Sequence, residues 1–248
     1  MLNHYLKPDW PAPKNIIAYT TTREGGVSNT PYHSFNLAAH VGDNLESVIK
    51  NRAILKKDLN LPSDPIWLNQ THSTNVISLD NPITNLNADA SFTTKPNTVC
   101  AVLTADCLPL LICTKTGTKV AAIHAGWQGL LNGIIESTIN ALEEDGNNLL
   151  VWLGPAISNK AFIVKDDVRD VFVEKNAEAK IAFTPVSNDI NDSWHADLYL
   201  LARLRLTKYN ITNIYGGTFC TYNEPKKFFS FRRDNGITGR MASIIFVN

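Results

Sequence analysis

The sequence predicts a mixed α and β fold, with strands dominating the middle of the chain and helices covering the outer faces. Three observations support this prediction. Short apolar runs alternate with segments of helical period along the 248 residues. Several of these runs are apolar at nearly every position, which is typical of strands covered on both faces. No low-complexity linker or repeat interrupts the pattern, so we expect one large domain or two intimately packed halves.

Six apolar runs are predicted to form β-strands, because each is four to eight residues long and bounded by turn-forming residues. They are I-I-A-Y-T (16–20), V-C-A-V-L-T (99–104), L-P-L-L-I-C (108–113), K-V-A-A-I-H (119–124), L-L-V-W-L-G (149–154) and S-I-I-F-V (243–247). The segment T-K-T-G-T (114–118) predicts a turn that pairs the third and fourth runs antiparallel.

Three segments have helical period: 45–59 with Asp43 or Asn44 as N-cap, 129–143 stopped at Gly146, and 196–209. The first of them has an inward stripe made by Leu45, Val48, Leu55 and Leu59, and Arg52 falls in that stripe. An arginine there either reaches the rim of the core and donates to a carbonyl, or presents its guanidinium to a carboxylate or phosphate in a pocket. The spacing leaves both interpretations open.

Charge and composition exclude several classes of function. The 23 basic and 23 acidic residues cancel, and no Lys/Arg run is present, so we expect no nucleic-acid partner. No stretch approaches eighteen uncharged apolar residues and no leader pattern is present, which predicts a cytoplasmic protein that does not enter a membrane. The cysteines lack the density and spacing of a disulfide scaffold, so we expect free thiols at Cys100, Cys107, Cys113 and Cys220.

Polar residues at the open end of the predicted hairpin form a candidate site. Asp106 and Cys107 precede one arm and His124 closes the other, so the thiol and the imidazole can meet. His72, in N-Q-T-H-S (69–73) after an apolar run, is the best third member. Two histidines and one cysteine would bind zinc with a fourth position open, which is the catalytic arrangement. There are two alternatives. One is a Cys–His nucleophile pair without metal, and the other is a core thiol beside two hydrogen-bonded histidines.

Further motifs follow in order along the chain. Besides T-A-D-C-L-P-L (104–110) and H-A-G-W-Q-G (124–129), they are T-R-E-G-G-V-S (22–28), F-N-L-A-A-H-V-G-D (35–43), N-R (51–52), Q-T-H-S (70–73), L-G-P-A-I (153–157), F-F-S-F-R-R-D (228–234) and T-G-R (238–240). Together they resemble the YfiH family, also described as the laccase-domain or multicopper polyphenol oxidase family. The chain departs from the family at Gln128, where an arginine is usual, and that raises the question of a lost phosphate or substrate contact.

The resemblance implies an α+β fold in a single domain over residues 1–248, with two β-sheets packed face to face and helices outside, in four α/β/β/α layers. It also implies zinc held by His72, Cys107 and His124, with copper as the alternative metal. The implied reactions are phosphorolysis of adenosine, inosine, guanosine and methylthioadenosine, and deamination of adenosine to inosine. The implied partners are a purine nucleoside and phosphate, and we expect a monomer.

Roles for individual residues follow from this chemistry. Asp106 is the candidate proton carrier in deamination. Phosphorolysis requires cations that hold phosphate, and the candidates are Arg52, Arg23, Arg232 and Arg233. Asn36 could orient a ribose hydroxyl and Phe231 could stack on the base, although both also suit structural roles. His40 and His195 are further candidates for the lining of a pocket.

Three rival functions remain. A copper polyphenol oxidase is disfavoured, because six histidines and two methionines do not easily supply a blue-copper centre and a three-copper cluster. An amide hydrolase that edits cell-wall precursors could use Cys107 as nucleophile or a zinc-bound water. A nucleotide-binding module without catalysis is the third alternative.

Overall fold

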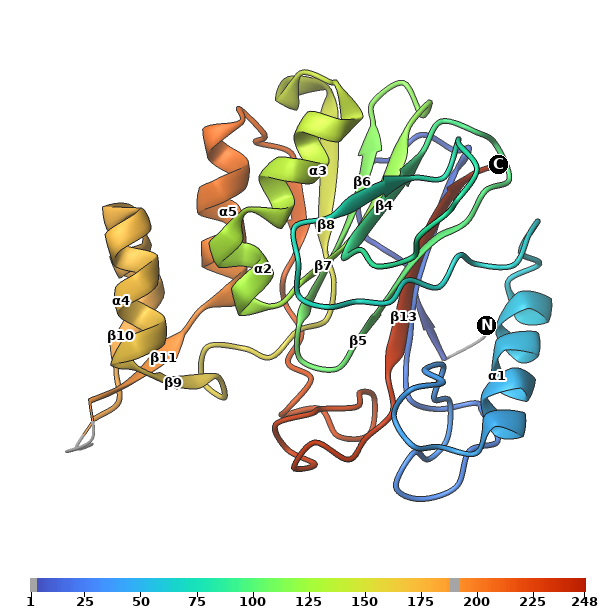
Figure 1. Ribbon diagram of the computed structural model, residues 1–248, viewed down its shortest axis with the longest axis horizontal. Helices are drawn as coiled ribbons and strands as arrows, with labels where there is room; N and C mark the ends of the chain where they lie inside the picture. Colours follow the sequence, from blue (N-terminus) through green and yellow to red (C-terminus); the bar gives the residue numbers. More distant parts are fainter. Residues whose placement is uncertain (1–3, 188–191) are drawn as a thin grey trace.

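Two β-sheets stacked face to face form the centre of the protein, as the computed structural model shows for residues 4–187 and 192–248 (Figure 1). The four-stranded sheet has the order β1-β2-β13-β5 and the six-stranded sheet the order β12-β8-β6-β7-β4-β3. Their bounds are β1 (Tyr5–Leu6), β2 (Ile16–Thr21), β3 (Val76–Ser78), β4 (Ala90–Thr93), β5 (Cys100–Thr104), β6 (Leu108–Thr114), β7 (Val120–Ala125), β8 (Leu149–Leu153), β12 (Ile214–Gly216) and β13 (Met241–Val247).

The core between the sheets explains why the central strands are apolar on both faces. Val102 and Ile245 of the four-stranded sheet pack with Leu111 and Ala122 of the six-stranded sheet in one buried cluster. The opposite faces of the same strands pack against helices, so every residue of β5, β6, β7, β8 and β13 is buried. All six predicted strands are confirmed, with ends that differ by at most two residues.

Helices cover the outer face of each sheet. Helix α1 (Leu45–Asp58) packs on the four-stranded sheet, whereas α2 (Trp127–Asn132), α3 (Ile134–Leu142) and α5 (Leu198–Lys208) cover the six-stranded sheet. The expected order of layers, α/β/β/α, is therefore confirmed. No helix in the described parts of the chain is long and apolar enough to cross a membrane.

Two details of the predicted helices are wrong. The segment 129–143 is two helices rather than one, because Gly133 adopts a left-handed conformation (φ 104°) that glycine tolerates and that ends α2. In α1, Leu45 is 57% exposed, and the buried positions are Val48, Asn51 and Leu55. The predicted N-cap at Asn44 is correct, since its side chain accepts a hydrogen bond from the Ser47 amide.

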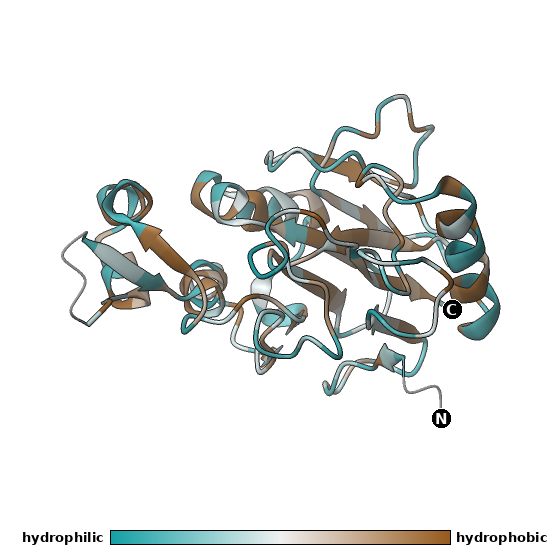
Figure 2. Cartoon of the chain, turned by 90° about the horizontal axis from the view of Figure 1, so that it is seen from below, coloured by the Kyte–Doolittle hydropathy of each residue, from teal (hydrophilic) through white to brown (hydrophobic). Residues whose placement is uncertain are grey.

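A third, small sheet with a helix of its own was not predicted. Strands β9 (Ile163–Lys165), β10 (Phe183–Pro185) and β11 (Ser193–Ala196) form it in the order β10-β11-β9, and α4 (Asp166–Lys175) packs against it. This unit projects from one end of the protein, on the left in Figures 1 and 2. Its strands have three or four residues, which is too short for a period to be recognised in the sequence. The described residues also form two 3₁₀ helices, Gly146–Asn148 and Ala177–Ala182.

Candidate functional site

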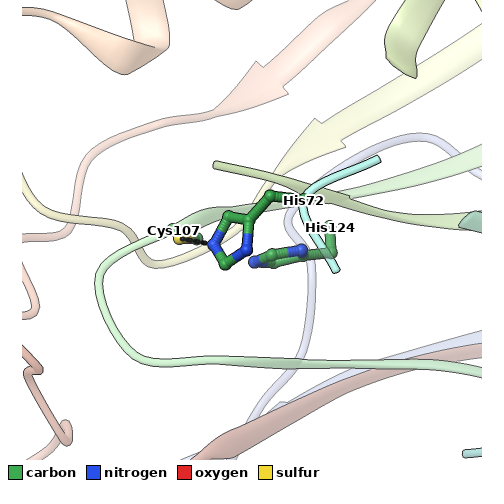
Figure 3. Close-up of side chains that lie close together, drawn as sticks. All are labelled: His72, Cys107 and His124. Carbon is green, nitrogen blue, oxygen red and sulfur yellow. Dashed lines mark hydrogen bonds between the residues drawn. The ribbon is translucent and has the colours of Figure 1, made fainter. Parts of the chain in front are cut away.

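The β6–β7 hairpin brings Cys107 and His124 together. Strands β6 and β7 pair antiparallel, with Pro109 opposite His124 and Leu108 opposite Ala125. Cys107 directly precedes β6, so its side chain lies at the same end of the hairpin as the imidazole. The long segment before β3 adds His72, whose ring centroid lies 4.8 Å from that of His124. Figure 3 shows the three side chains directed at one another. Their candidate ligand atoms all lie within 4.8 Å of one another.

Asp89, immediately before β4, fixes the two histidines. It is fully buried, and one carboxylate oxygen accepts hydrogen bonds from His124 Nδ1 at 2.8 Å and from the His72 amide at 3.0 Å. The other oxygen accepts from the amides of Thr71 and Ser73 and from the Ser73 hydroxyl. These amide bonds hold the turn in which His72 has a left-handed backbone (φ 60°). The bond to Nδ1 leaves His124 Nε2 as the nitrogen available to a metal.

The charges in this group support one another. Burial raises the pKa of Asp89, but hydrogen bonds from His124 and Ser73 outweigh it and lower that pKa. Burial also raises the pKa of Cys107, yet the charge of His124 and hydrogen bonds from both histidines lower it from 9.0 to about 6. For His124, burial lowers the pKa, and the stronger effects of Cys107 and Asp89 raise it. Without metal, the group therefore favours a thiolate next to an imidazolium. The thiolate is the form that binds metal, and a metal would also require His124 Nε2 to lose its proton.

The three residues fit a zinc ion with one open coordination position. The Cys107 Sγ to His72 Nε2 distance is 3.8 Å, about the separation of two ligands around one tetrahedral zinc. Gly126 keeps the space between these ligands open, since a Cβ there would lie 2.7 Å from His72 Cδ2 and 3.1 Å from Cys107 Sγ. Imidazole and thiolate ligands suit zinc and also copper. Among the described residues, this is the one cluster of three or more such side chains that could hold a metal.

The candidate metal group lies in the wall of a cavity of about 300 Å³, a volume within the range of small-molecule sites. Aromatic and aliphatic side chains make up much of the lining, and a few polar groups converge on it. The polar and aromatic members are His40, Gln70, His72, Thr104, Asp106, Cys107, His124, Trp127, Phe162, Phe231, Arg232 and Arg240. The predicted site residues Asp106, Phe231 and Arg232 thus line the same cavity as the candidate metal group, and so does His40.

Asp106 lines this cavity with both carboxylate oxygens already engaged. One accepts from the Thr221 hydroxyl at 2.6 Å, and the other from the Ser230 hydroxyl and the Arg232 amide at 3.0 and 2.7 Å. Asp106 has a left-handed backbone (φ 84°), which fixes the turn before Cys107. Its visible role is to connect that turn to the segment that carries Phe231 and Arg232.

Several predicted ligand-binding residues do not line the cavity. Asn36 is fully buried, and its side chain bonds to Ala38, Asp43 and the Arg240 amide. Arg23 donates to the carbonyls of residues 33 and 225. Arg233 pairs with Asp234 and donates to three carbonyls. These side chains stabilise the loops around the cavity.

Arg52 also lies outside the cavity lining. Its guanidinium stacks over Trp67 at 4.3 Å and donates to the Leu37 carbonyl. This contact corresponds to the first interpretation of Arg52, an arginine at the rim of the core that donates to a carbonyl. His195 contacts the Asn159 carbonyl away from the cavity. Gln128 is exposed and does not line the cavity, so the structure shows no cavity contact at this position.

Sequence reasoning missed four residues that shape the site: Asp89, Trp127, Phe162 and Arg240. Asp89 directly precedes β4, but that strand reads A-S-F-T and leaves no apolar run, so the sequence did not mark Asp89 as a residue at a strand end. Arg240 directly precedes β13 in the same way. Phe162 belongs to a segment without a recognisable period, so only the folded chain brings it to the cavity.

Comparisons with known proteins find relatives over almost the whole chain. The family model described as multi-copper polyphenol oxidoreductase laccase matches residues 17–248. A protein of Haemophilus influenzae named purine nucleoside phosphorylase is 52% identical over 97% of this chain and 98% of its own length. The purine nucleoside phosphorylase YfiH of Escherichia coli is 47% identical over 99% and 100%. A crystal structure from Neisseria meningitidis superposes with a TM-score of 0.92 at 46% identity, covering 99% of this chain and 100% of that one.

Proposed function

Because this chain belongs to the multi-copper polyphenol oxidoreductase laccase family, and because its relatives include proteins named purine nucleoside phosphorylase, we propose that it is a metal-dependent purine nucleoside phosphorylase. The observation that carries the proposal is the His72–Cys107–His124 group in the wall of a cavity that also presents aromatic rings and arginines. Zinc is the proposed metal, and adenosine, inosine, guanosine and methylthioadenosine are the proposed substrates.

The residues of the cavity suit phosphorolysis. In this reaction the bond between ribose C1′ and the purine nitrogen breaks, a phosphate oxygen bonds to C1′, and the free base leaves. Phe231, 51% exposed at the cavity, presents a ring on which a purine can stack. The guanidinium of Arg232 adds positive charge for the phosphate, and the Asp106 contact with the Arg232 amide positions that segment.

Deamination of adenosine is the second proposed reaction of this site. A bound zinc would supply a water of lowered pKa for attack on C6 of adenine. His72, Cys107 and His124 would hold that ion, and Asp89 orients two of these ligands. Asp106 remains the proposed proton carrier, and an Asp106→Asn variant that deaminates normally would remove it from this role.

A second candidate function has one observation in its favour. Cys107, His124 and Asp89 line up as a thiol, an imidazole and a buried carboxylate bonded to the imidazole, which is the order of a cysteine hydrolase triad. Without metal, the same residues could hydrolyse an amide, as in the editing of a cell-wall precursor. Metal dependence separates the two functions, because chelation would abolish phosphorolysis and leave a free thiolate nucleophile intact.

The experiment incubates purified protein with adenosine, with and without phosphate, and separates adenine, inosine and hypoxanthine by chromatography. Adenine that forms only with phosphate, and not with Cys107→Ala, is the expected result. Inosine formed without phosphate would report deamination. Unchanged adenosine would contradict the proposal and favour amide hydrolysis or binding alone, and equal turnover by Cys107→Ala would reveal a contaminating enzyme.

A further inference from the structure

Arg240 is a cavity residue whose charge is not balanced by an ion pair. Its guanidinium lines the cavity, donates from Nη1 to the Thr238 and Gly239 carbonyls, and lies 5.5 Å from the centre of the Phe231 ring. Among the other partly buried arginines, Arg205 pairs with Glu136 and Arg233 with Asp234, whereas Arg52 and Arg203 donate to backbone carbonyls. Within the described ranges, neither Arg240 nor Arg232, whose guanidinium donates to the Ile163 carbonyl, has a carboxylate at ion-pair distance.

The acidic groups that line the cavity with Arg240 already have other hydrogen-bond partners or belong to the candidate metal group. Asp106 is the one carboxylate among the residues that line the cavity, and three donors other than Arg240 occupy its oxygens. The Cys107 thiolate belongs to the candidate metal group. Burial lowers the pKa of the Arg240 guanidinium, and the nearby charges of Cys107 and Asp106 oppose that effect without forming an ion pair with it. Among the described residues, the Nε and Nη2 donors of Arg240 have no hydrogen-bond partner, so they are available to an anionic ligand in the cavity.

The backbone of Arg240 is held in place before any ligand arrives. Its amide donates to the buried Asn36 side chain at 3.0 Å, and its carbonyl accepts from the Leu37 amide at 3.3 Å. Asn36 is thus a positioning residue for Arg240. A guanidinium on a fixed backbone loses little conformational freedom when it binds an anion, which favours tight recognition.

We propose that Arg240, together with Arg232, forms the subsite that binds the phosphate co-substrate. This rests on the proposed phosphorolysis, and it moves the main phosphate contact from Arg52, Arg23 and Arg233 to an arginine that lines the cavity. Arginine offers a planar fork of donors that matches two phosphate oxygens, whereas lysine offers a single point charge. His40 lines the same cavity, and burial together with the charges of Arg240 and Arg52 lowers its pKa, so its imidazole is neutral and adds no repulsion.

The test measures inorganic phosphate binding to the metal-loaded protein by calorimetry, and the KM values for phosphate and adenosine. Arg240→Gln should weaken phosphate binding and raise KM for phosphate by about tenfold or more, because a charge-assisted fork is lost. KM for adenosine should change far less. Arg203→Gln is the matched control, since Arg203 also donates to two backbone carbonyls but lies outside this cavity. An unchanged phosphate Kd in Arg240→Gln would overturn the proposal.

A second variant and a second ligand distinguish failure of the phosphate subsite from failure of the proposed phosphorylase function. If Arg240→Gln does not fold, Arg240→Lys carries the test, and it should still raise KM for phosphate because the fork is lost. Adenosine monophosphate is titrated in parallel, and binding of this nucleotide without binding of inorganic phosphate would also overturn the proposal. If wild-type protein binds inorganic phosphate through Arg240 but releases no adenine, the phosphate subsite stands and the proposed phosphorylase function fails.

Discussion

His124 Nδ1 lies 2.8 Å from a carboxylate oxygen of Asp89, and the same oxygen receives the amide of His72. One buried carboxylate thus orients two of the three candidate metal ligands, one through its ring and the other through its backbone. The β6–β7 hairpin, which carries Cys107 and His124, is distant in sequence from the segment before β3, which carries His72. Asp89 makes them a single site.

Asp89→Asn should weaken zinc binding by about 10- to 100-fold, because partners that orient metal-bound histidines have effects of this size. It should also cost about 1–3 kcal/mol of unfolding free energy, since an amide nitrogen would face donors that need an acceptor. Competition titration with a chromogenic chelator and urea denaturation measure the two effects. Ser73→Ala removes one donor to Asp89 but keeps the His124 bond, so it should lose less affinity for zinc. Equal zinc affinity in Asp89→Asn and wild type would contradict the orienting role.

Gly126→Ala should abolish metal binding without unfolding the protein. A methyl group there would lie 2.7 Å from His72 Cδ2 and push that ring away from Cys107. Gly129→Ala is the control, because its Cβ would meet Ile134 Cγ2 at 3.3 Å and none of the candidate ligands. Metal content by mass spectrometry and thermal unfolding distinguish the two variants. A Gly126→Ala protein that retains one metal per chain would show that the ligand space is wider than the structure indicates.

Alkylation of Cys107 in the metal-free protein should reach half its maximal rate near pH 6 instead of near pH 9. The thiolate reacts, and its fraction rises with pH through the pKa, so a lowered pKa means fast reaction at neutral pH. His124→Ala removes the positive charge that most lowers the pKa of Cys107, so it should shift the midpoint of alkylation to higher pH. Iodoacetamide rates are measured from pH 5 to 9 in a Cys220→Ser background. Cys100 and Cys113 are buried, so this substitution leaves Cys107 as the accessible thiol. A midpoint near 9 in the Cys220→Ser protein with His124 intact would contradict the pairing of the Cys107 thiolate with the His124 imidazolium.

Tyr199→Phe should destabilise the protein by about 1–3 kcal/mol, because it leaves a buried amide without its acceptor. The Tyr199 hydroxyl accepts from the Ala156 amide and donates toward the Gly154 and Phe219 carbonyls. Urea denaturation measures the loss. Tyr222→Phe, at an exposed tyrosine, should change stability little. Equal midpoints for the two variants would show that this hydroxyl contributes nothing to the loop before Asn159.

The central strands and the metal group could be predicted from the sequence because both leave local patterns. Strands buried on both faces read as apolar runs, and a turn at 114–118 places residues 107 and 124 at one end of a hairpin. His72 was suggested by its position at the end of an apolar run, and the family resemblance gave the same three ligands. Stacked sheets came from the resemblance, since a strand pattern does not say which sheet a strand joins.

Other parts of the site depend on long-range contacts that no local pattern reports. The sequence does not distinguish Arg240 from Arg52, Arg23 and Arg233. Only the fold shows which of these guanidinium groups lines the cavity. Gly133 divides a segment whose helical period continues across it, so the pattern concealed a left-handed residue. The third sheet consists of strands too short to recognise, and it comes together only when residues 163–165 and 193–196 pair.

Stepwise addition of zinc to metal-free protein, with adenosine and phosphate present, tests the central claim most directly. We predict that the rate of adenine release rises from near zero and reaches a plateau at one zinc per chain. His72→Ala, Cys107→Ala and His124→Ala should remain inactive throughout the titration. Full phosphorolysis by metal-free protein, or a plateau that persists in these variants, would contradict a site built on His72, Cys107 and His124.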